Sequence, residues 1–318
     1  MYMRATHSSI VIAISMLALT SLSACSIISP RSGSSKPEIR DVPFQARDRS
    51  ELTPRKRVMV LPFIDNGTQR TDKAKTAARD AFIRALRKTD DFVIVANSDF
   101  PKDIATYLKN GEYDLESMAK IGSGMGLNAI LEGRIIEVRA KRIGDAVGLV
   151  RQVRAKIDAT VQLRMVSTSN NHIVMNETRQ ASVEDGTTRI AERAFSDRFL
   201  EEDPYLIEQV ITEAFKTTIP KIVQNVDKLT WQGRVALVKG ERIYLNAGRL
   251  SGLQIGDILK VTEEGEDVYD PDSGALVGRV PGRLKGTVEV VSYFGKDGAV
   301  SIVHSGSGFR ENDHVELY

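Results

Sequence analysis

The most reactive side chain in this 318-residue sequence belongs to its only cysteine, Cys25. It follows an uncharged apolar run, Ile10–Leu22, and two small residues, Ser23 and Ala24. A lone thiol cannot form a disulfide within the chain, and it cannot build a zinc site that needs several thiolates. The run, about 13 residues long, is too short to cross a bilayer as a helix, which takes about 20, but it has the length of a signal-peptide core. We therefore expect an exported chain.

The tetrad Leu22-Ser23-Ala24-Cys25 resembles a bacterial lipobox. The resemblance implies that residues 1–24 are a signal peptide, that cleavage precedes Cys25, and that the cysteine is acylated, first with diacylglycerol on its sulfur. Because Ser26 rather than an aspartate follows, it also implies sorting to the outer membrane. Two or three acyl chains supply the multiple signals that stable membrane attachment requires. The alternative is a signal peptide cleaved elsewhere, with an incidental cysteine.

The segment Gly122-Ser123-Gly124-Met125-Gly126 has the composition of a phosphate-binding loop. Such a loop follows a strand and precedes a helix. Here the glycines follow an expected helix and precede an expected strand, so the order is reversed. The pattern favours a helix C-cap and a turn.

The segment Asp270-Pro271-Asp272-Ser273-Gly274 has the opening spacing of a calcium loop. The twelfth position of that loop requires a glutamate, and here it is Pro281. The segment is typical of a β-turn, and cation binding at Asp270–Gly274 stays open as the alternative.

The remaining residues that could act in catalysis form no recognisable group. The four histidines, His7, His172, His304 and His314, include no pair spaced by two or four residues. No nucleophile elbow or zinc-protease helix motif occurs in the sequence. We expect a non-enzymatic protein with no catalytic residue, no cofactor and no metal.

Eight bases lie between residues 134 and 164, against the acids Glu137, Asp145 and Asp158. This cluster favours a basic face for an anionic partner such as peptidoglycan, lipid headgroups or an acidic protein, and the alternative is a solvated strand face. The net charge of +2 gives no overall basic field, so nucleic acid is not expected. We expect residues 139–142 to lie at a loop. The eight bases are Arg134, Arg139, Lys141, Arg142, Arg151, Arg154, Lys156 and Arg164.

The elements that position these residues divide the chain into regions. A composition of 42% apolar and 27% charged residues is globular, and the length favours two domains. Residues 25–56 are rich in Ser, Pro, Arg and Asp without periodicity, which predicts a flexible tether. An α/β domain is expected over residues 57–227, and a small all-β barrel over residues 228–318.

The α/β domain is predicted from hydrophobic periodicity. The expected order, β-α-β-α-β-β-β-α-α, gives a mixed sheet with helices packed on it. Asp203-Pro204 is a good cap and first-turn pair, and Pro220 is expected to kink or end the last helix. Strands are expected at 58–63, 92–95, 129–138, 153–165 and 173–183, and helices at 72–88, 115–122, 187–199 and 204–217.

Three segments of this domain carry a family resemblance: VMVLPFIDNGT, DDFVIVANSDF and IGSGMGLNAILEGRI. With the helices between them, they resemble the periplasmic domain of CsgG-like curli secretion lipoproteins over about residues 57–225. The same block recurs in the N-terminal domain of TolB, in lipoprotein activators of penicillin-binding proteins, and in flagellar assembly protein T. The resemblance implies the fold.

The C-terminal region shows short strands between Gly, Asp and Asn turns, which predicts a small barrel. Its motif Asn246-Ala247-Gly248, Gly252-Leu253 and Gly256-Asp257, followed by the Asp270–Gly274 turn, resembles the C-terminal domain of flagellar assembly protein T. The resemblance implies an SH3-like barrel. Strands are expected at 233–238, 242–246, 257–262, 285–292, 299–303 and 314–317.

These observations favour a lipid-anchored scaffold on the outer membrane, facing the periplasm. Its role would be the assembly or positioning of an envelope machine of the flagellar-assembly kind. The alternatives are a curli-type secretion or assembly component and a lipoprotein activator of a cell-wall synthase. The expected partners are the outer membrane through the lipid and envelope proteins, with peptidoglycan and further copies of the chain as additional candidates.

Overall fold

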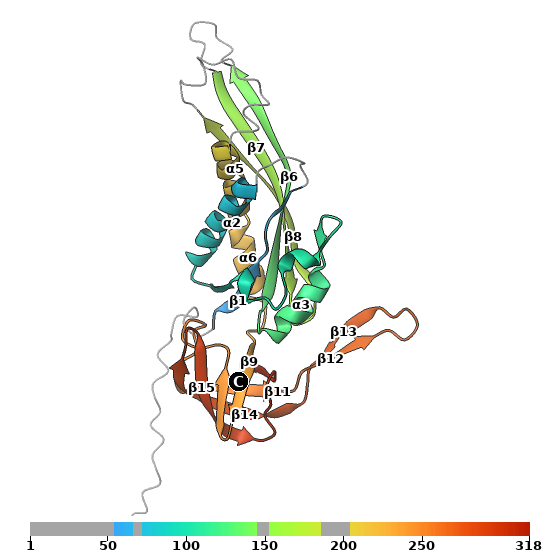
Figure 1. Ribbon diagram of the computed structural model, residues 1–318, viewed down its shortest axis with the longest axis vertical. Coiled ribbons are helices and arrows are strands. Elements are labelled where there is room, and N and C mark those ends of the chain that lie inside the picture. Colours follow the sequence, from blue (N-terminus) through green and yellow to red (C-terminus); the bar gives the residue numbers. More distant parts are fainter. Residues whose placement is uncertain (1–53, 66–71, 145–152, 186–203) are drawn as a thin grey trace, which may run out of the picture. The chain divides into compact units, whose positions relative to one another are not determined.

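A computed structural model describes residues 54–65, 72–144, 153–185 and 204–318 (Figure 1). These residues all belong to one unit, Arg47–Tyr318. Four features predicted from the sequence lie outside the described residues: Cys25 with its lipobox, most of the tether, the helix expected at 187–199, and Arg151.

A mixed sheet with the strand order β3-β1-β6-β7-β8 forms the first region. β1 pairs in parallel with both β3 and β6, whereas β6, β7 and β8 form an antiparallel meander. The predicted mixed sheet is therefore confirmed. The strands are β1 (Lys56–Val60), β2 (Ile64–Asp65), which pairs with β6, β3 (Phe92–Val95), β6 (Ala129–Gly144), β7 (Val153–Ser167) and β8 (Ile173–Asp185).

Helices pack on both faces of this sheet (Figure 1). One apolar cluster joins the sheet to α2, α5 and α6, and a second joins its other face to α3 and the preceding 3₁₀ turns. Pro220 was expected to kink or end the helix at 204–217, and that helix does end at Lys216, four residues before the proline. It lies in the first turn of a further helix, where a missing N–H has no helical partner to lose. The helices are α2 (Asp72–Arg87), α3 (Leu115–Gly124), α5 (Pro204–Lys216) and α6 (Ile219–Val226).

Three phenylalanines form the centre of the first apolar cluster. The rings of Phe63 and Phe215 stack with centroids 4.1 Å apart, and Phe82 lies 6.0 and 5.7 Å from them. Gly133 of β6 leaves room for this group, because a Cβ there would lie 2.6 Å from the Phe63 ring and 2.9 Å from that of Phe215. The aromatic contact thereby fixes α5 against the middle of the sheet.

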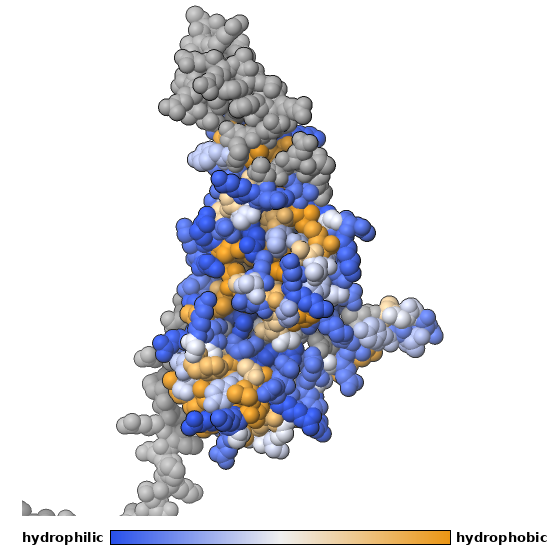
Figure 2. Space-filling model, viewed as in Figure 1, coloured by the Kyte–Doolittle hydropathy of each residue, from blue (hydrophilic) through white to orange (hydrophobic). Residues whose placement is uncertain are grey.

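The second region is a closed six-stranded barrel with the order β10-β15-β14-β11-β16-β9, as the short-strand pattern predicted. Its interior is one apolar cluster that includes Trp231, Leu259 and Val288. Other apolar residues gather on the outer face of the barrel strands (Figure 2). The strands are β9 (Gly233–Lys239), β10 (Arg242–Leu245), β11 (Ile258–Thr262), β14 (Leu284–Phe294), β15 (Gly298–Gly306) and β16 (His314–Leu317).

A hairpin that the sequence analysis missed interrupts the barrel between β11 and β14. It consists of β12 (Glu266–Tyr269) and β13 (Leu276–Val280), and the Asp270–Gly274 segment is its turn. The Asp270 carboxylate accepts hydrogen bonds from the backbone N–H of Asp272 at 3.1 Å and of Ser273 at 2.7 Å. The hydrogen bonds from Ser273 lower the pKa of Asp270. The carboxylate therefore stabilises the turn itself.

Candidate functional site

The face of β6, β7 and β8 that lies away from α5 is mainly polar beyond the second apolar cluster, which covers Ile130 and Val166. Strand side chains alternate between faces, and every second residue of β7 from Ile157 to Met165 is buried in the first apolar cluster. The alternate positions are polar, and we call them the polar sheet face. Its residues are Glu132, Arg134, Glu137, Arg139, Lys141, Lys156, Asp158, Thr160, Gln162, Arg164, Asn176, Thr178, Gln180, Ser182 and Glu184.

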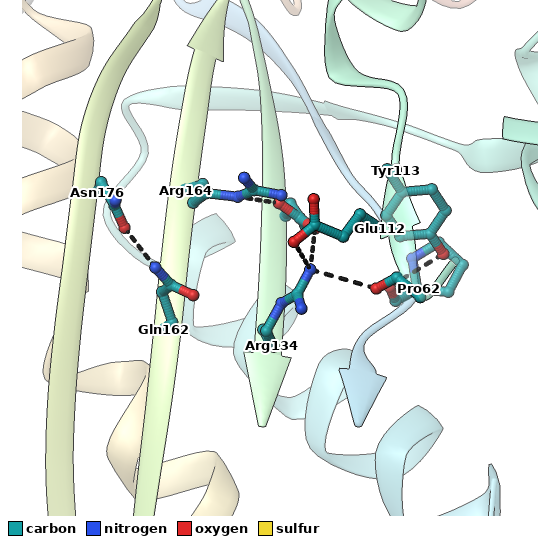
Figure 3. Close-up of polar contacts among 9 residues, drawn as sticks. Pro62, Glu112, Tyr113, Arg134, Gln162, Arg164 and Asn176 are labelled. Carbon is teal, nitrogen blue, oxygen red and sulfur yellow. Dashed lines mark hydrogen bonds and ion pairs between the residues drawn. The ribbon is translucent and has the colours of Figure 1, made fainter. Parts of the chain in front are cut away.

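The centre of the polar sheet face is a buried carboxylate, Glu132, which is 1% exposed. Arg164 donates from Nε to its Oε2 at 2.5 Å, and Nη2 of Arg134 lies 3.5 Å from its Oε1. The same Arg134 nitrogen also lies 3.3 Å from Oε1 of Glu112. Figure 3 shows Arg134 and Arg164 on neighbouring strands of the sheet with Glu112 beside them, and the Gln162–Asn176 hydrogen bond of 2.8 Å continues the polar row onto β8.

A small hairpin positions Glu112 beside this carboxylate. Its strands, β4 (Leu108–Lys109) and β5 (Glu112–Tyr113), are joined by Asn110 and Gly111, which have φ angles of 52° and 78°. Two consecutive positive φ angles are the geometry of a type I′ turn, which Asn-Gly favours. The turn aims the Gly111 carbonyl at Arg134, 3.2 Å away.

Tyr113 closes the site on the side of the β4–β5 hairpin. Its hydroxyl donates a hydrogen bond to the Pro62 carbonyl at 3.2 Å (Figure 3). Burial, with a smaller contribution from the negative charge of Glu132, raises the pKa of Tyr113 to about 12. The phenol therefore stays neutral and serves as a hydrogen-bond donor.

The arrangement is suited to holding structure and presenting charge. Each oxygen of Glu132 faces a guanidinium group, and the hydrogen bond to Glu132 raises the pKa of Arg164. A buried carboxylate needs such partners, because an isolated charge in a protein interior is strongly destabilising. The cluster therefore ties the β4–β5 hairpin to β6 and β7 and leaves a polar surface for a partner.

The structure pairs four of the eight predicted bases with acids. Arg134 and Arg164 share Glu132, Arg139 lies 2.6 Å from Glu137, and Lys156 lies 3.8 Å from Asp158. The described surface thus carries mixed charge.

The bases of residues 139–142 do not lie at a loop as expected. They lie within β6, because the pairing of β6 with β7 continues to Gly144. In that register Arg142 is opposite Ala155, and Arg154 is opposite Ile143.

The sequence analysis missed Glu132, which is the centre of the site. The residue stands in an apolar strand, and a single acid there gives no periodic signal. The available signal was its spacing from Arg134, because residues two apart in a strand share a face. The Asn110-Gly111 pair was likewise a recognisable hairpin signal.

The glycine-rich segment ends α3 and contacts the barrel, and no loop of the phosphate-binding order is formed. Met125 follows the helix as its cap, and Gly126 has a φ of 71°. Asn246 donates to the Met125 carbonyl at 2.9 Å and accepts from the Arg234 backbone at 2.8 Å. A Cβ on Gly126 would lie 2.6 Å from the Asn246 amide nitrogen, so the close approach requires glycine.

Arg234 completes this junction from the barrel side. It is 2% exposed, donates to the Ser123 carbonyl at 2.8 Å and lies 3.1 Å from the Ser123 hydroxyl. The motif that begins at Asn246 therefore has a role at the junction besides its role in the barrel turns.

Among the residues that the structure describes, no group of three or more His, Cys, Asp or Glu side chains could hold a metal ion. None of the helices described is both long enough and apolar enough to cross a membrane.

Comparison with known proteins supplies a family. The profile of the family described as curli production assembly/transport component CsgG matches residues 40–254, which is more than half of the chain. Among curated proteins, none matches this chain.

Several solved structures resemble the chain at 11–14% sequence identity. The protein CT253 from Chlamydia trachomatis has 14% identity and a TM-score of 0.36, and the match covers 54% of this chain and 98% of that one. A minor lipoprotein from Acinetobacter baumannii has 11% identity and a TM-score of 0.28, covering 55% and 95%. Lipoprotein GNA1162 from Neisseria meningitidis has 13% identity and a TM-score of 0.27, covering 48% and 95%.

Proposed function

The chain belongs to the CsgG family, and from that premise we propose that it is a non-enzymatic, lipid-anchored scaffold on the periplasmic side of the outer membrane. It assembles or positions an envelope machine by presenting the polar sheet face to a protein partner. The observation that carries the proposal is the family match over residues 40–254, which spans the sheet and reaches into the barrel.

The site supports a binding role over a catalytic one. The buried carboxylate Glu132 is held between Arg134 and Arg164. The Tyr113 hydroxyl is engaged with a backbone carbonyl, and its pKa of about 12 keeps it neutral. These groups order a surface, and the outer row of polar side chains on β7 and β8 is available for hydrogen bonds to a partner.

The kind of envelope machine has three candidates. The first is a machine of the flagellar-assembly kind, which the Asn246–Asp257 motif supports through its resemblance to an SH3-like barrel. The family description, which names curli assembly and transport, favours a curli-type component as the second candidate. A lipoprotein activator of a cell-wall synthase is the third.

The anchor is tested by Cys25→Ser. We expect this variant to remain an uncleaved precursor that takes up no radiolabelled palmitate, because the acceptor sulfur is gone. Ser26→Ala is the matched control and should be processed normally. Unchanged labelling and membrane fractionation in Cys25→Ser would contradict the lipobox.

The scaffold role is tested by crosslinking the full chain in its native envelope and purifying it. A stoichiometric protein partner without ion conductance in planar bilayers supports the scaffold. Conducting oligomers would instead support the curli-type transport component, and capture of a cell-wall synthase would support the activator.

A further inference from the structure

β8 forms one edge of the sheet, and among the described strands only β7 pairs with it. It is 13 residues long. A long open edge is a template for pairing with another strand, and natural proteins block it with proline, lysine, inward-pointing charges, a bulge or a very short strand. Pairing that joins inward-pointing charges of opposite sign removes this block. Between Ile173 and Asp185 there is no proline and no lysine. Its charges towards the helix-covered face are Glu177 and Arg179, which lie opposite Leu163 and Val161 of β7.

The sequence of β8 complements itself in an antiparallel pairing centred on Thr178. In this register Glu177 of one copy lies opposite Arg179 of the other, and the same contact is repeated across the two-fold axis. Apolar Met175 then lies opposite Ala181, and polar Asn176 lies opposite Gln180, whereas Val174 lies opposite Ser182. The regular register ends at the bulge between Met175 and Ile173.

Neighbouring registers lose this match. Centring the pair on Glu177 or on Arg179 places like charges opposite each other, which is destabilising. A shift by one residue exchanges the two faces of the strand, so that the polar sheet face of one copy meets the helix-covered face of the other. The register centred on Thr178 therefore combines opposite charges with matching faces.

We propose that two copies of this chain pair through β8, centred on Thr178, to form a two-fold dimer with one continuous sheet. The second strand satisfies the open edge of the first. The proposal depends neither on the lipid anchor nor on the identity of an envelope partner.

Engineered disulfides test the register in the full chain, in the bacterial envelope. Thr178→Cys places two thiols directly opposite each other, with Cα atoms about 4.5–5.5 Å apart, which is within the range that a disulfide bridges. We expect a reducible covalent dimer under mild oxidation. Gln180→Cys is the matched control on the same face, since its two thiols would lie about 13 Å apart along the strands. The natural chain controls for Cys25.

Two further arms make the test specific. Asn176→Cys and Gln180→Cys chains, separately tagged and co-expressed, should crosslink to each other but not to themselves. If Thr178→Cys stays monomeric while folded, or if Gln180→Cys crosslinks as readily as Thr178→Cys, the proposal is wrong.

Charge reversal tests the same interface without a covalent bond. Arg179→Glu and Glu177→Arg each place like charges across the axis twice, so we expect the dimer dissociation constant of the full chain in detergent to rise about tenfold. Mixing the two single variants restores both opposite-charge contacts and should recover a heterodimer. This mixture leaves the 3.1 Å pair within each chain broken, so its recovery separates the interface from the fold. Failure of the mixture to associate would overturn the proposed register.

Discussion

The open sheet and the closed barrel satisfy their backbones in different ways. The sheet runs from β3 to β8 and ends at both strands, whereas the barrel returns from β9 to β10. A closed barrel removes its edges, and an open sheet keeps them. The barrel can therefore be complete within one chain, while the sheet offers hydrogen-bonding groups to a partner.

The two regions also distribute their charges differently. In the sheet, Glu132 and its two arginines lie among the polar side chains of the polar sheet face. In the barrel, buried polar groups serve turns and the junction: Asp297 accepts hydrogen bonds from Gly248 and Ser251, and Arg234 contacts Ser123. This difference supports the proposal that the sheet recognises the partner, while the buried polar groups of the barrel hold the chain together. The following predictions test that division.

The largest effect is expected from Phe215→Ala in the sheet core. Loss of the ring stacked on Phe63 should lower the free energy of unfolding by about 3–5 kcal/mol. Helical circular dichroism reports the sheet region, since every described helix of eight or more residues lies within residues 72–226. Fluorescence of the only tryptophan, Trp231, which is 3% exposed, reports the barrel.

We expect Phe215→Ala to move the urea midpoint of the helical signal more than that of the tryptophan. Leu259→Ala, at a fully buried barrel position, is the matched control and should show the opposite pattern. Equal shifts of both signals in both variants would mean that the two regions unfold as one.

The next effect concerns the junction and uses Arg234→Ala. The variant removes hydrogen bonds to Ser123 and leaves buried acceptors unsatisfied, so we expect the free energy of unfolding of the full chain to fall by about 2 kcal/mol.

Residues 229–318 alone should fold with a β-type spectrum, because Leu229 begins a new β-rich pattern that leads into the closed barrel.

The same substitution in the 229–318 fragment sharpens the comparison. There the Ser123 contact is already absent, so the cost of Arg234→Ala should be smaller than in the full chain. An unfolded natural fragment would show instead that the sheet region completes the barrel.

The sequence predicted the elements with strong periodicity and missed those determined by tertiary contacts. The helix at 72–88 and the strand at 153–165 were recovered because each buries one regular apolar face, as the structure shows for α2 and β7. The β12–β13 hairpin was missed because Val268 and Val280 are exposed, so no apolar face marks its strands.

The centre of the site escaped prediction for a related reason. Glu132 is part of the site because Arg164 donates a hydrogen bond to it. Arg164 is 32 residues away in the sequence and lies opposite Glu132 only because of the register of β6 and β7. Pattern reasoning finds residues that are near in sequence. It grouped Arg134 with other bases, whereas the fold gives that side chain acidic partners.

A third effect is confined to alkaline pH. The tyrosine pKa of 10.0 in the unfolded chain rises to about 12 at Tyr113 in the folded chain. Between these values the unfolded state loses its proton while the folded state keeps it, so stability falls as the pH rises above 10. From pH 9 to pH 11 we expect Tyr113 to account for a loss of about 1 kcal/mol.

Urea unfolding at the two pH values measures the Tyr113 contribution. Tyr113→Phe should lose less stability than the natural chain over that interval, although it lacks the hydrogen bond to Pro62 at both pH values. Tyr205→Phe, at a position 66% exposed, is the control and should behave like the natural chain. An identical pH dependence in all three chains would contradict a buried, neutral Tyr113.

The smallest effect on stability, and the most direct test of recognition by the sheet, is charge reversal at Arg139 and Lys141. Both side chains are exposed on β6, so Arg139→Glu with Lys141→Glu should change the free energy of unfolding by no more than about 0.5 kcal/mol, even though the Arg139–Glu137 pair is lost.

If these bases attract an anionic partner, binding of the full-length double variant to isolated peptidoglycan or to vesicles containing phosphatidylglycerol should be weaker than that of the natural chain. The difference should shrink as salt shortens the screening length to about 8–10 Å. The neutral variant, Arg139→Gln with Lys141→Gln, separates lost attraction from added repulsion. Unchanged affinity and salt dependence in both variants would make these bases solvated surface, and the barrel would then become the leading candidate for partner docking.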